Sequence, residues 1–236
     1  MNPVLFYGVP SGCSIGSVIA LEWIAQPYHL CRIEMLQHPW NEVYAKINPR
    51  MKTPALLLED GASLTESLAI LQNIGGRGID AGLGFQQGTR EFDRLAEMLS
   101  YLTTDLFAAF APLWKLYDAN ETSGPTKEVL RKLGVESVNK EFSYLETLLS
   151  DRQWLLGGSK PTVADAYLFA IGRWAEYHKV CNLQESYPNV YRYLHRLGED
   201  PAVRFALDIE QGKSVKDNGS FKGHVTFEEL SARIAQ

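Results

Sequence analysis

The first third of the chain alternates short apolar runs, typical of buried strands, with longer amphipathic stretches, typical of helices. The runs "VLFY" and "YHLCRIEM" predict two strands, and two further short runs flank Asp60-Gly61, a dipeptide that indicates a hairpin turn. Helices are expected over residues 14–25, 40–47 and 65–74, with Thr65 as the N-cap of the last. This order of elements predicts a small α/β domain in which helices cover both faces of a mixed sheet.

Beyond residue 88 the apolar positions recur every three or four residues, which is the period of an α-helix. Two long stripes show this period: Leu95, Met98, Leu99, Leu102, Leu106, Phe110 and Leu113, and then Leu130, Leu133, Val138, Phe142, Leu145 and Leu149. In "PTVADAYLFAIGRWA", Asp165 follows Thr162 by three residues, a variant of the capping box that predicts a helix start at Thr162. Further helices are expected over roughly 187–197 and 201–207, and no strand is expected in this part.

Six glycines in "GGRGIDAGLGFQQG", residues 75 to 88, suit neither helix nor strand and indicate an inter-domain linker. The predicted domain organisation is an α/β domain over 1–76, a linker over 77–88, an all-helical domain over 89–211 and a C-terminal extension over 212–236. The extension is polar and glycine-punctuated until the amphipathic "FEELSARI". We expect it either to fold over the functional site as a lid or to remain a solvated tail.

The composition limits the kinds of molecule that the protein is expected to bind. The 236 residues are 45% hydrophobic, enough for a sizeable core, and the net charge of -5 offers no basic face for nucleic acid or an anionic membrane. A small molecule or a protein is therefore the expected partner. The start has no basic region followed by an apolar stretch, and eighteen apolar residues never run uninterrupted, so we expect a cytoplasmic protein without a membrane segment.

The cysteines and histidines indicate neither a disulfide framework nor a metal site. Three cysteines, an odd number, lie at wide spacings without a C-x-x-C pattern. The histidines at 29, 178, 195 and 224 have no carboxylate or cysteine at ligand spacing. We therefore expect no metal, and any special role of a thiol belongs to one cysteine alone.

Pro54 stands at the entry of the first hairpin strand, where a residue without an N–H cannot donate to a sheet ladder. One interpretation is a trans proline that opens an edge strand. The other is a cis Thr53–Pro54 bond, which would turn the backbone N–H and C=O of Thr53 outward. A peptide-like ligand could then pair with Thr53 as an added strand.

The motifs "NPRMKTPALLLEDGASLTESLAI" and "PTVADAYLFAIGRWA" resemble those of the soluble glutathione S-transferases, and the resemblance extends to about residue 207. It implies a thioredoxin-like α/β N-terminal domain, an all-α C-terminal domain and a homodimer. It also implies that Pro54 is cis and that the Thr53 backbone pairs with the cysteinyl part of glutathione.

The same resemblance places further residues at the glutathione site. Glu66 and Ser67 begin a helix, where unpaired N–H groups and the helix dipole favour a carboxylate. Ser67 would hold the γ-glutamyl carboxylate and Glu66 would attract the ammonium group. Lys52 and Gln37 complete the implied glutathione contacts, although Gln37 stands where the bacterial beta class usually has a lysine.

Three residues are candidates for the side chain that contacts or activates the glutathione sulfur. Cys13 falls at the start of a helix, whose N–H groups would lower its pKa, and "CSIGSVIAL" resembles the beta-class pattern in which this cysteine contacts the glutathione sulfur. Ser11 would be the activating residue by likeness to the theta and zeta classes, and Tyr7 by likeness to the alpha, mu and pi classes. Cys13 is the first choice, then Ser11, then Tyr7.

Beta-class enzymes carry a histidine where this chain has Phe107. Phe107, Phe110 and Trp114 would then line an apolar pocket for the electrophile, although the same spacing serves a helix core equally well. The expected function is conjugation of glutathione to small hydrophobic electrophiles, or reduction of mixed disulfides. The alternatives are a non-catalytic binder of glutathione or hydrophobic ligands, and a glutathione-dependent isomerase or dehalogenase that uses Ser11.

Overall fold

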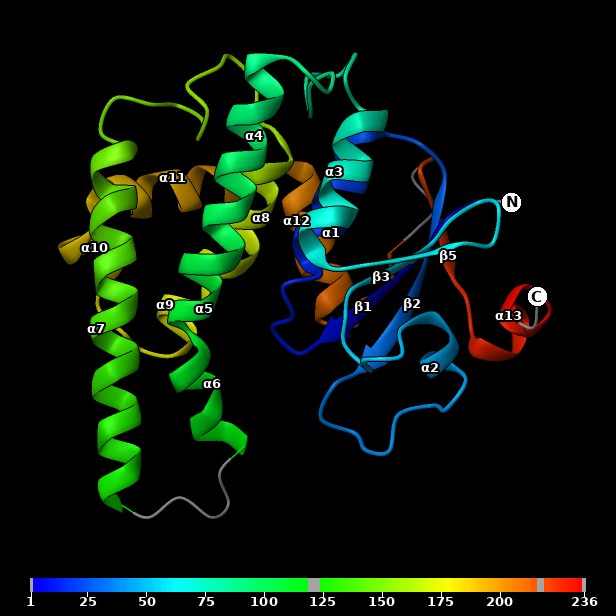
Figure 1. Cartoon of the computed structure of the whole chain (residues 1–236), viewed down its shortest axis with the longest axis horizontal. Helices are drawn as coiled ribbons and strands as arrows, with labels where there is room; N and C mark the ends of the chain where they lie inside the picture. Colours follow the sequence, from blue (N-terminus) through cyan, green and yellow to red (C-terminus); the bar gives the residue numbers. More distant parts are fainter. Residues whose placement is uncertain (1, 119–123, 216–218, 235–236) are drawn as a thin grey trace.

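The computed structural model describes residues 2–118, 124–215 and 219–234, so parts of the predicted helical domain (119–123) and of the extension (216–218 and 235–236) lie outside it. The molecule has two parts, a sheet with its flanking helices and a set of long helices beside it (Figure 1). This arrangement is the predicted one, an α/β thioredoxin-like part followed by an all-helical part.

The sheet has five strands in the order β4-β3-β1-β2-β5. Their bounds are Val4–Val9 (β1), Tyr28–Glu34 (β2), Ala55–Leu57 (β3), Ser63–Thr65 (β4) and Phe221–His224 (β5). β1 and β2 run parallel, as do β2 and β5, whereas β3 is antiparallel to both β1 and β4. The predicted mixed sheet and its hairpin are therefore present.

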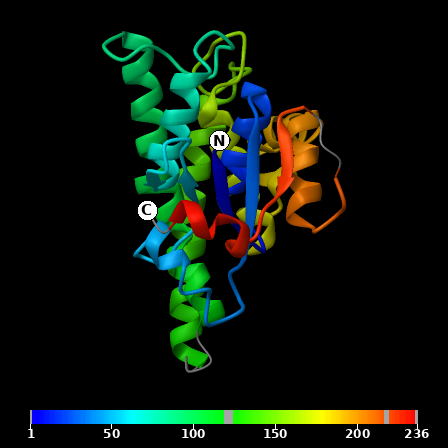
Figure 2. The ribbon, with the colours of Figure 1, turned by 90° about the vertical axis from the view of Figure 1, so that its right-hand side faces the viewer.

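Each face of the sheet has its own apolar core, because successive side chains of a strand point to opposite sides. Leu5 and Tyr7 of β1 join the core under α1 (Ile15–Ile24) and α3 (Ser67–Arg77). Val4 and Phe6 join the other core, under α2 (Tyr44–Ile47) and α13 (Phe227–Ile234). Helices thus cover both faces, and Figure 2 shows α13 in front of the sheet, whose strands lie side by side.

The helical part begins with a nearly continuous line of turns that includes a π-helical segment, η1. Its elements are α4 (Arg90–Tyr101), η1 (Leu102–Leu106), α5 (Phe107–Ala109) and α6 (Ala111–Asp118). The remaining helices are α7 (Gly124–Leu148), α8 (Val163–Gly172), α9 (Trp174–Tyr177), α10 (Leu183–Ser186), α11 (Pro188–Gly198) and α12 (Pro201–Glu210). Every residue of α8 is buried, and α1 packs against α8 and α12, which joins the two parts.

The predicted helix start at Thr162 is confirmed. The Asp165 carboxylate accepts hydrogen bonds from the Thr162 N–H at 2.7 Å and from the Leu155 N–H at 2.9 Å, and the Thr162 hydroxyl accepts one from the Ala164 N–H. The predicted stripes are largely buried, but Leu133 is exposed.

Two predicted boundaries were wrong. Thr65 lies in β4, and α3 begins at Ser67 with Glu66 at its N-cap in a left-handed conformation (φ 74°). α3 also continues through Gly75 and Gly76 to Arg77 instead of stopping at a glycine linker. Gly75 is suited to this place because a Cβ there would lie 3.3 Å from Val163 Cγ2, and α8 packs closely against α3.

The expectation for the C-terminal extension was wrong in both of its forms. The chain returns to the sheet, where β5 pairs with the edge of β2, and α13 packs Leu230 into the core under Phe6 and Tyr44. Arg233 also donates hydrogen bonds to the carbonyls of Asn2 and Leu58. The described part of the extension is thus neither a lid over the predicted site nor a solvated tail.

Candidate functional site

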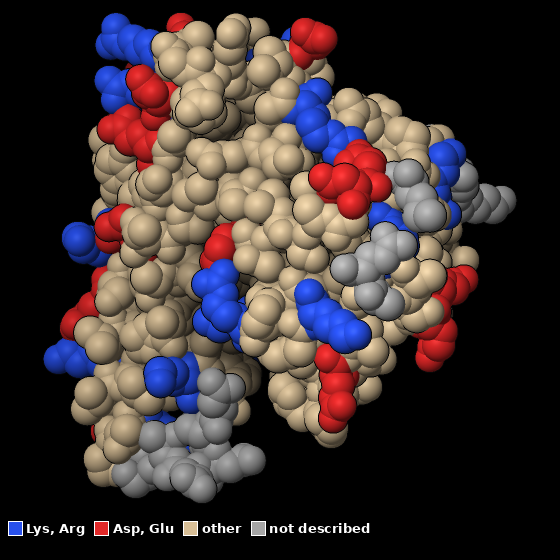
Figure 3. Space-filling model, turned by 45° about the vertical axis from the view of Figure 1, so that its right-hand side comes forward, with Lys and Arg blue, Asp and Glu red and all other residues tan. Residues whose placement is uncertain are grey.

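A cleft of about 230 Å³ lies where the two parts of the molecule meet. Its lining residues come from the loop before α1, the segment before β3, the start of α3, and η1, α5 and α8: Cys13, Asn48, Lys52, Thr53, Pro54, Glu66, Ser67, Thr103, Phe107 and Tyr167. The surface is visibly hollowed between the helical part and the sheet part (Figure 3).

The segment before β3 is held so that its backbone borders the cleft. The Thr53–Pro54 peptide bond is cis, as the resemblance implied. The carbonyl of Lys52 accepts hydrogen bonds from the Tyr44 hydroxyl at 2.7 Å and from Asn48 Nδ2 at 2.6 Å. These two side chains therefore fix the backbone on the N-terminal side of Thr53.

Thr53 also fits closely against β1. A Cβ at Gly8 would lie 2.3 Å from Thr53 Oγ1, so only glycine leaves room for the threonine there. The absence of a side chain at position 8 thus keeps the segment before Pro54 in place.

The start of α3 presents Ser67 to the cleft, close to unpaired N–H groups at the helix end. Its neighbour Glu66 forms an ion pair with Arg50, and Arg50 Nη2 also donates to Thr65 Oγ1 at 3.2 Å. Both members of the ion pair are more than half exposed, so Glu66 faces solvent at the cleft rim.

Cys13 Sγ lies 3.6 Å from Ser67 Oγ, within hydrogen-bond distance for sulfur. Cys13 is just before α1, where Gly12 and Cys13 carbonyls accept from the N–H groups of Ile15 and Gly16. Burial raises the pKa of the Cys13 thiol, while the Ser67 hydroxyl and the positive charge of Arg173 act in the opposite direction. The expected lowering of this pKa was wrong, because desolvation in the closed surroundings outweighs the helix end.

Tyr167 lies at the base of the cleft and is almost completely buried. Burial raises the pKa of its hydroxyl well above the ordinary value, and the neighbouring Ser67 hydroxyl opposes this. Sequence reasoning missed Tyr167 together with Asn48 and Thr103. Tyr167 lies inside the recognised motif "PTVADAYLFAIGRWA", but that motif was used only for the helix start and the family resemblance.

The structure does not bring every predicted site residue to this cleft. Tyr7 is buried outside this cleft, where its hydroxyl is 2.9 Å from His224 Nε2. Gln37 is exposed on the loop after β2. Ser11 is not among the lining residues, and its carbonyl accepts a hydrogen bond from Trp174 Nε1 at 2.8 Å.

Of the three aromatic residues predicted to hold an electrophile, only Phe107 lines the cleft. Phe110 is completely buried in the core. Trp114 does not line the cleft and packs against Trp174. The Phe107 ring also contacts Trp174, with a ring separation of 5.3 Å. Phe107 is thus the inner end of an aromatic cluster.

Across the part of the chain that the structure describes, no three histidine, cysteine or acidic side chains are grouped so that they could hold a metal ion. No helix of that same part combines the length and apolar character needed to cross a membrane.

Comparison with known proteins places this geometry in context. Residues 17–77 match the family model for the glutathione S-transferase N-terminal domain, and residues 109–201 match that for the C-terminal domain. The chain is similar to glutathione S-transferase GstA of Escherichia coli O157:H7, with 32% identity over 208 residues that span 87% of this chain and 98% of that protein.

Solved structures give the same result. A sphingomonad glutathione S-transferase complexed with glutathione is 30% identical, with a TM-score of 0.77, over 88% of this chain and 98% of that one. A bacterial beta class glutathione S-transferase of Sphingomonas chungbukensis has the same identity, TM-score and coverage.

Proposed function

The chain belongs to the glutathione S-transferase family, and we propose that it binds glutathione in the cleft between its two parts and uses Cys13 to contact the thiol. It is a glutathione S-transferase. The observation that carries the site proposal is the 3.6 Å approach of Cys13 Sγ to Ser67 Oγ, in a cleft that Thr53 and Pro54 also line.

Each part of glutathione has a partner in this cleft. The backbone N–H and C=O of Thr53 pair with the cysteinyl residue in the manner of an added strand. Ser67 and the N–H groups at the start of α3 hold the γ-glutamyl carboxylate, since a helix N-terminus favours an anion. Glu66 attracts the ammonium group, so that its carboxylate is shared between this group and Arg50. Lys52, exposed at the rim, is a further cation for a glutathione carboxylate.

The raised pKa of Cys13 favours a particular role for this residue. A thiol that stays protonated at neutral pH is a weak nucleophile but can donate its S–H to a neighbouring anion. Cys13 therefore stabilises the thiolate of glutathione by a hydrogen bond, which serves conjugation. Reduction of mixed disulfides would need the Cys13 thiolate itself, so conjugation is the function that the cleft supports better.

The electrophile lies on the side of the cleft opposite the sheet. Phe107 offers an apolar face that is supported from behind by Trp174. The described residues that line the cleft include no histidine to act as proton acceptor. Ionisation of the thiol thus depends on local hydrogen bonds, and small hydrophobic electrophiles are the expected second substrates.

A thermal-shift titration with glutathione tests the binding site. Binding to the folded state alone stabilises it by about 2.7 kcal/mol at a hundredfold excess over the dissociation constant, which raises the melting temperature. Ser67→Ala removes a charge-assisted hydrogen bond worth about 1.5 to 3 kcal/mol, so this variant should need at least tenfold more glutathione for the same shift. Ser231→Ala, at an exposed position on α13, is the matched control. Equal responses of the two variants would contradict the assignment of Ser67.

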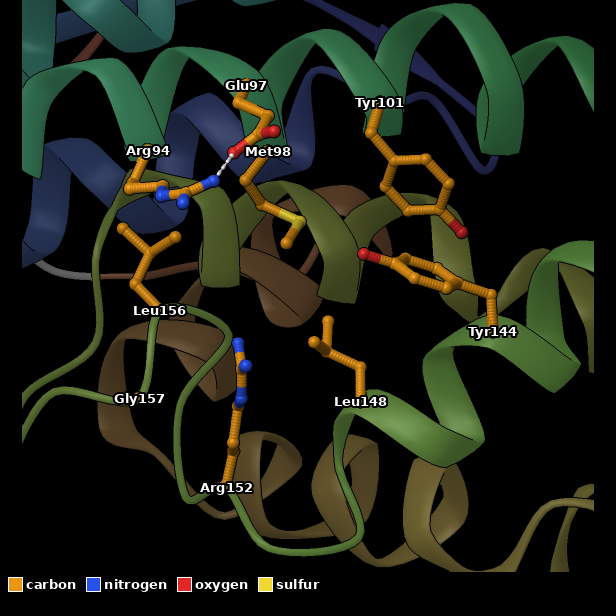
Figure 4. A pocket seen from close by; sticks show the side chains of 9 residues that line it. All are labelled: Arg94, Glu97, Met98, Tyr101, Tyr144, Leu148, Arg152, Leu156 and Gly157. Atoms are coloured by element: carbon orange, nitrogen blue, oxygen red, sulfur yellow. Dashed lines mark hydrogen bonds and ion pairs between the residues drawn. The ribbon is translucent and has the colours of Figure 1, made fainter.

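We propose that the protein is a homodimer that uses the outer face of α4 and α7. A cavity of about 640 Å³ opens there, and Figure 4 shows Met98, Tyr144 and Leu148 around it, with Arg94 and Arg152 toward one side. Tyr101 and Tyr144 pack edge to face at its border. Tyr144 is 49% exposed beside Met98 and Leu148, and an exposed aromatic side chain next to apolar ones is typical of a surface that a second subunit covers.

Sedimentation tests this assembly. A dimer sediments as twice the 26.5 kDa chain mass at micromolar protein. Tyr144→Arg should shift the population toward monomer, because it places a charge in the interface. Val129→Arg, at an exposed apolar position elsewhere on α7, should not. A wild-type protein that sediments only as a single chain would rule the proposal out.

The cysteines support a cytoplasmic location. All three are free thiols, which is the state maintained by a reducing compartment. Fractionation of cells that express the protein tests this directly, and recovery in an oxidising compartment would contradict it.

A further inference from the structure

The C-terminal extension builds a second cleft that the glutathione site does not use. The match to the family's C-terminal domain ends at residue 201, so the extension lies beyond it. Beyond α12, β5 pairs with β2 at the edge of the sheet, and α13 packs on the face of the sheet that carries Val4 and Phe6. The red strand and helix in Figure 2 follow this path.

The second cleft has a volume of about 710 Å³. Tyr7 and Arg32, neighbours on β1 and β2, form its floor, and Ile209, residues 212–214 and residues 224–227 form its walls. None of its lining residues also lines the glutathione cleft. The cavity is thus a separate feature, and residues of the extension make up much of its surface.

The polar groups of this cleft are fixed by the surrounding structure. Arg32 Nη1 donates to the carbonyls of Ile209 and Glu210, and Arg32 Nε donates to Glu34 Oε1 at 2.6 Å. Its side chain is nonetheless 32% exposed. Because the guanidinium is already held in one orientation, a ligand would not have to order it on binding.

The charges of the lining favour an anion. Among the described residues that line this cleft, Arg32 and Lys213 are cationic and none is acidic. Glu34 and Asp208, which pair with these two cations, lie outside the lining. The hydrogen bond between Tyr7 and His224 places a hydroxyl and an imidazole on the same surface.

The size and the apolar walls favour an organic ligand over an inorganic ion. Ile209, Val225 and Phe227 line the cleft beside the cations, and Val225 and Phe227 are partly exposed. A cavity with an apolar wall and a few convergent polar groups is the usual form of a small-molecule site. An ion such as phosphate would leave most of this volume unused.

We propose that this cleft is a second ligand site that binds a small organic carboxylate. Arg32 and Lys213 pair with the carboxylate, since a guanidinium and an ammonium are the side chains that hold such groups best. The apolar part of the ligand lies against Val225 and Phe227. The extension thus gives this chain a binding site in addition to the family's glutathione cleft.

Calorimetric titration with benzoate tests the site, with benzamide as the uncharged probe of the same shape. Both titrations contain saturating glutathione, so that the first cleft is occupied. Benzoate should bind saturably in the millimolar range, at one site per chain, and benzamide should not. Lys213→Glu should weaken benzoate binding about tenfold, the effect of losing one charge-assisted contact at a partly exposed site.

The controls separate this site from general charge effects. Lys115→Glu, on the exposed face of α6, changes the net charge equally and should leave benzoate binding unchanged. Lys213 pairs with Asp208 on the surface and packs in no core, so its substitution is compatible with folding. The proposal would be overturned if benzoate did not bind saturably or if benzamide bound equally well. It would also be overturned if both lysine variants lost benzoate affinity equally or if benzoate competed with glutathione.

Discussion

Leu230→Ala tests whether the extension is an integral part of the fold. Leu230 on α13 is 3% exposed and belongs to the apolar core on the outer face of the sheet. Truncation of a buried leucine to alanine costs about 2 to 5 kcal/mol, and the lower part of this range applies where the surroundings can relax. Because α13 is an eight-residue helix at the edge of the molecule, we expect a loss of about 2 to 3 kcal/mol.

Thermal unfolding measures this loss against a matched variant. For a chain of this size each kcal/mol lowers the melting temperature by about 2 to 4 °C, so Leu230→Ala should lower it by about 4 to 12 °C. Leu36→Ala makes the same chemical change at a position that is 78% exposed, and should stay within about 0.5 kcal/mol of the parent protein. Hydrogen exchange should show faster opening of residues 219–234 in Leu230→Ala alone. Equal, small effects in the two variants would refute the packing of α13 on the sheet.

Three further predictions concern the site and its support. Alkylation of Cys13 by iodoacetamide should be slower at neutral pH than alkylation of a model thiol, because the raised pKa of Cys13 leaves less thiolate. The alkylation rate should therefore still rise above about pH 9. A rate that reaches its plateau below about pH 8 would contradict this prediction. Asp165→Ala leaves several buried donors without their acceptor, and should lower the free energy of unfolding by on the order of 3 to 5 kcal/mol, as measured by denaturant unfolding. A decrease below about 1 kcal/mol would be inconsistent with these hydrogen bonds. In steady-state kinetics, Phe107→Ala should raise the KM for a hydrophobic electrophile about tenfold and leave the KM for glutathione nearly unchanged. Equal changes in the two constants would contradict the assignment of Phe107 to the electrophile site.

The sequence was sufficient for the elements whose signal is local. The period of the apolar stripes predicted the long helices, and the spacing of Thr162 and Asp165 predicted one helix start to the residue. β5 gave no such signal, because "FKGH" is four residues long, contains a glycine and shows no alternation. Its strand conformation depends on pairing with β2, nearly two hundred positions earlier.

Of the site residues, those that belong to local motifs were also predictable. Thr53, Pro54, Ser67 and Cys13 belong to short motifs, and all four line one cleft. Tyr167 reaches that cleft only through the packing of α8 against α1, which no local pattern specifies. The same packing explains the wrong expectation for the Cys13 pKa.

A helix N-terminus lowers the pKa of a neighbouring thiol, but the size of the opposing desolvation depends on what covers the thiol. In the folded chain, residues from the helical part, Phe107 and Tyr167 among them, line the cleft together with Cys13 and contribute to its desolvation. These residues are distant from Cys13 in sequence, so the local pattern around Cys13 could not predict how strongly the thiol is desolvated.

The central claim is that glutathione binds beside Cys13, and NMR of protein labelled with ¹³C at the cysteine β-carbons tests it most directly. The chain has three cysteines, of which Cys13 alone lines the glutathione cleft, while Cys31 lines the second cleft and Cys181 lines neither. Titration with glutathione should shift the Cys13 resonance saturably and leave the other two unchanged. An unchanged Cys13 resonance at millimolar glutathione, or a larger shift at Cys31 or Cys181, would contradict the account.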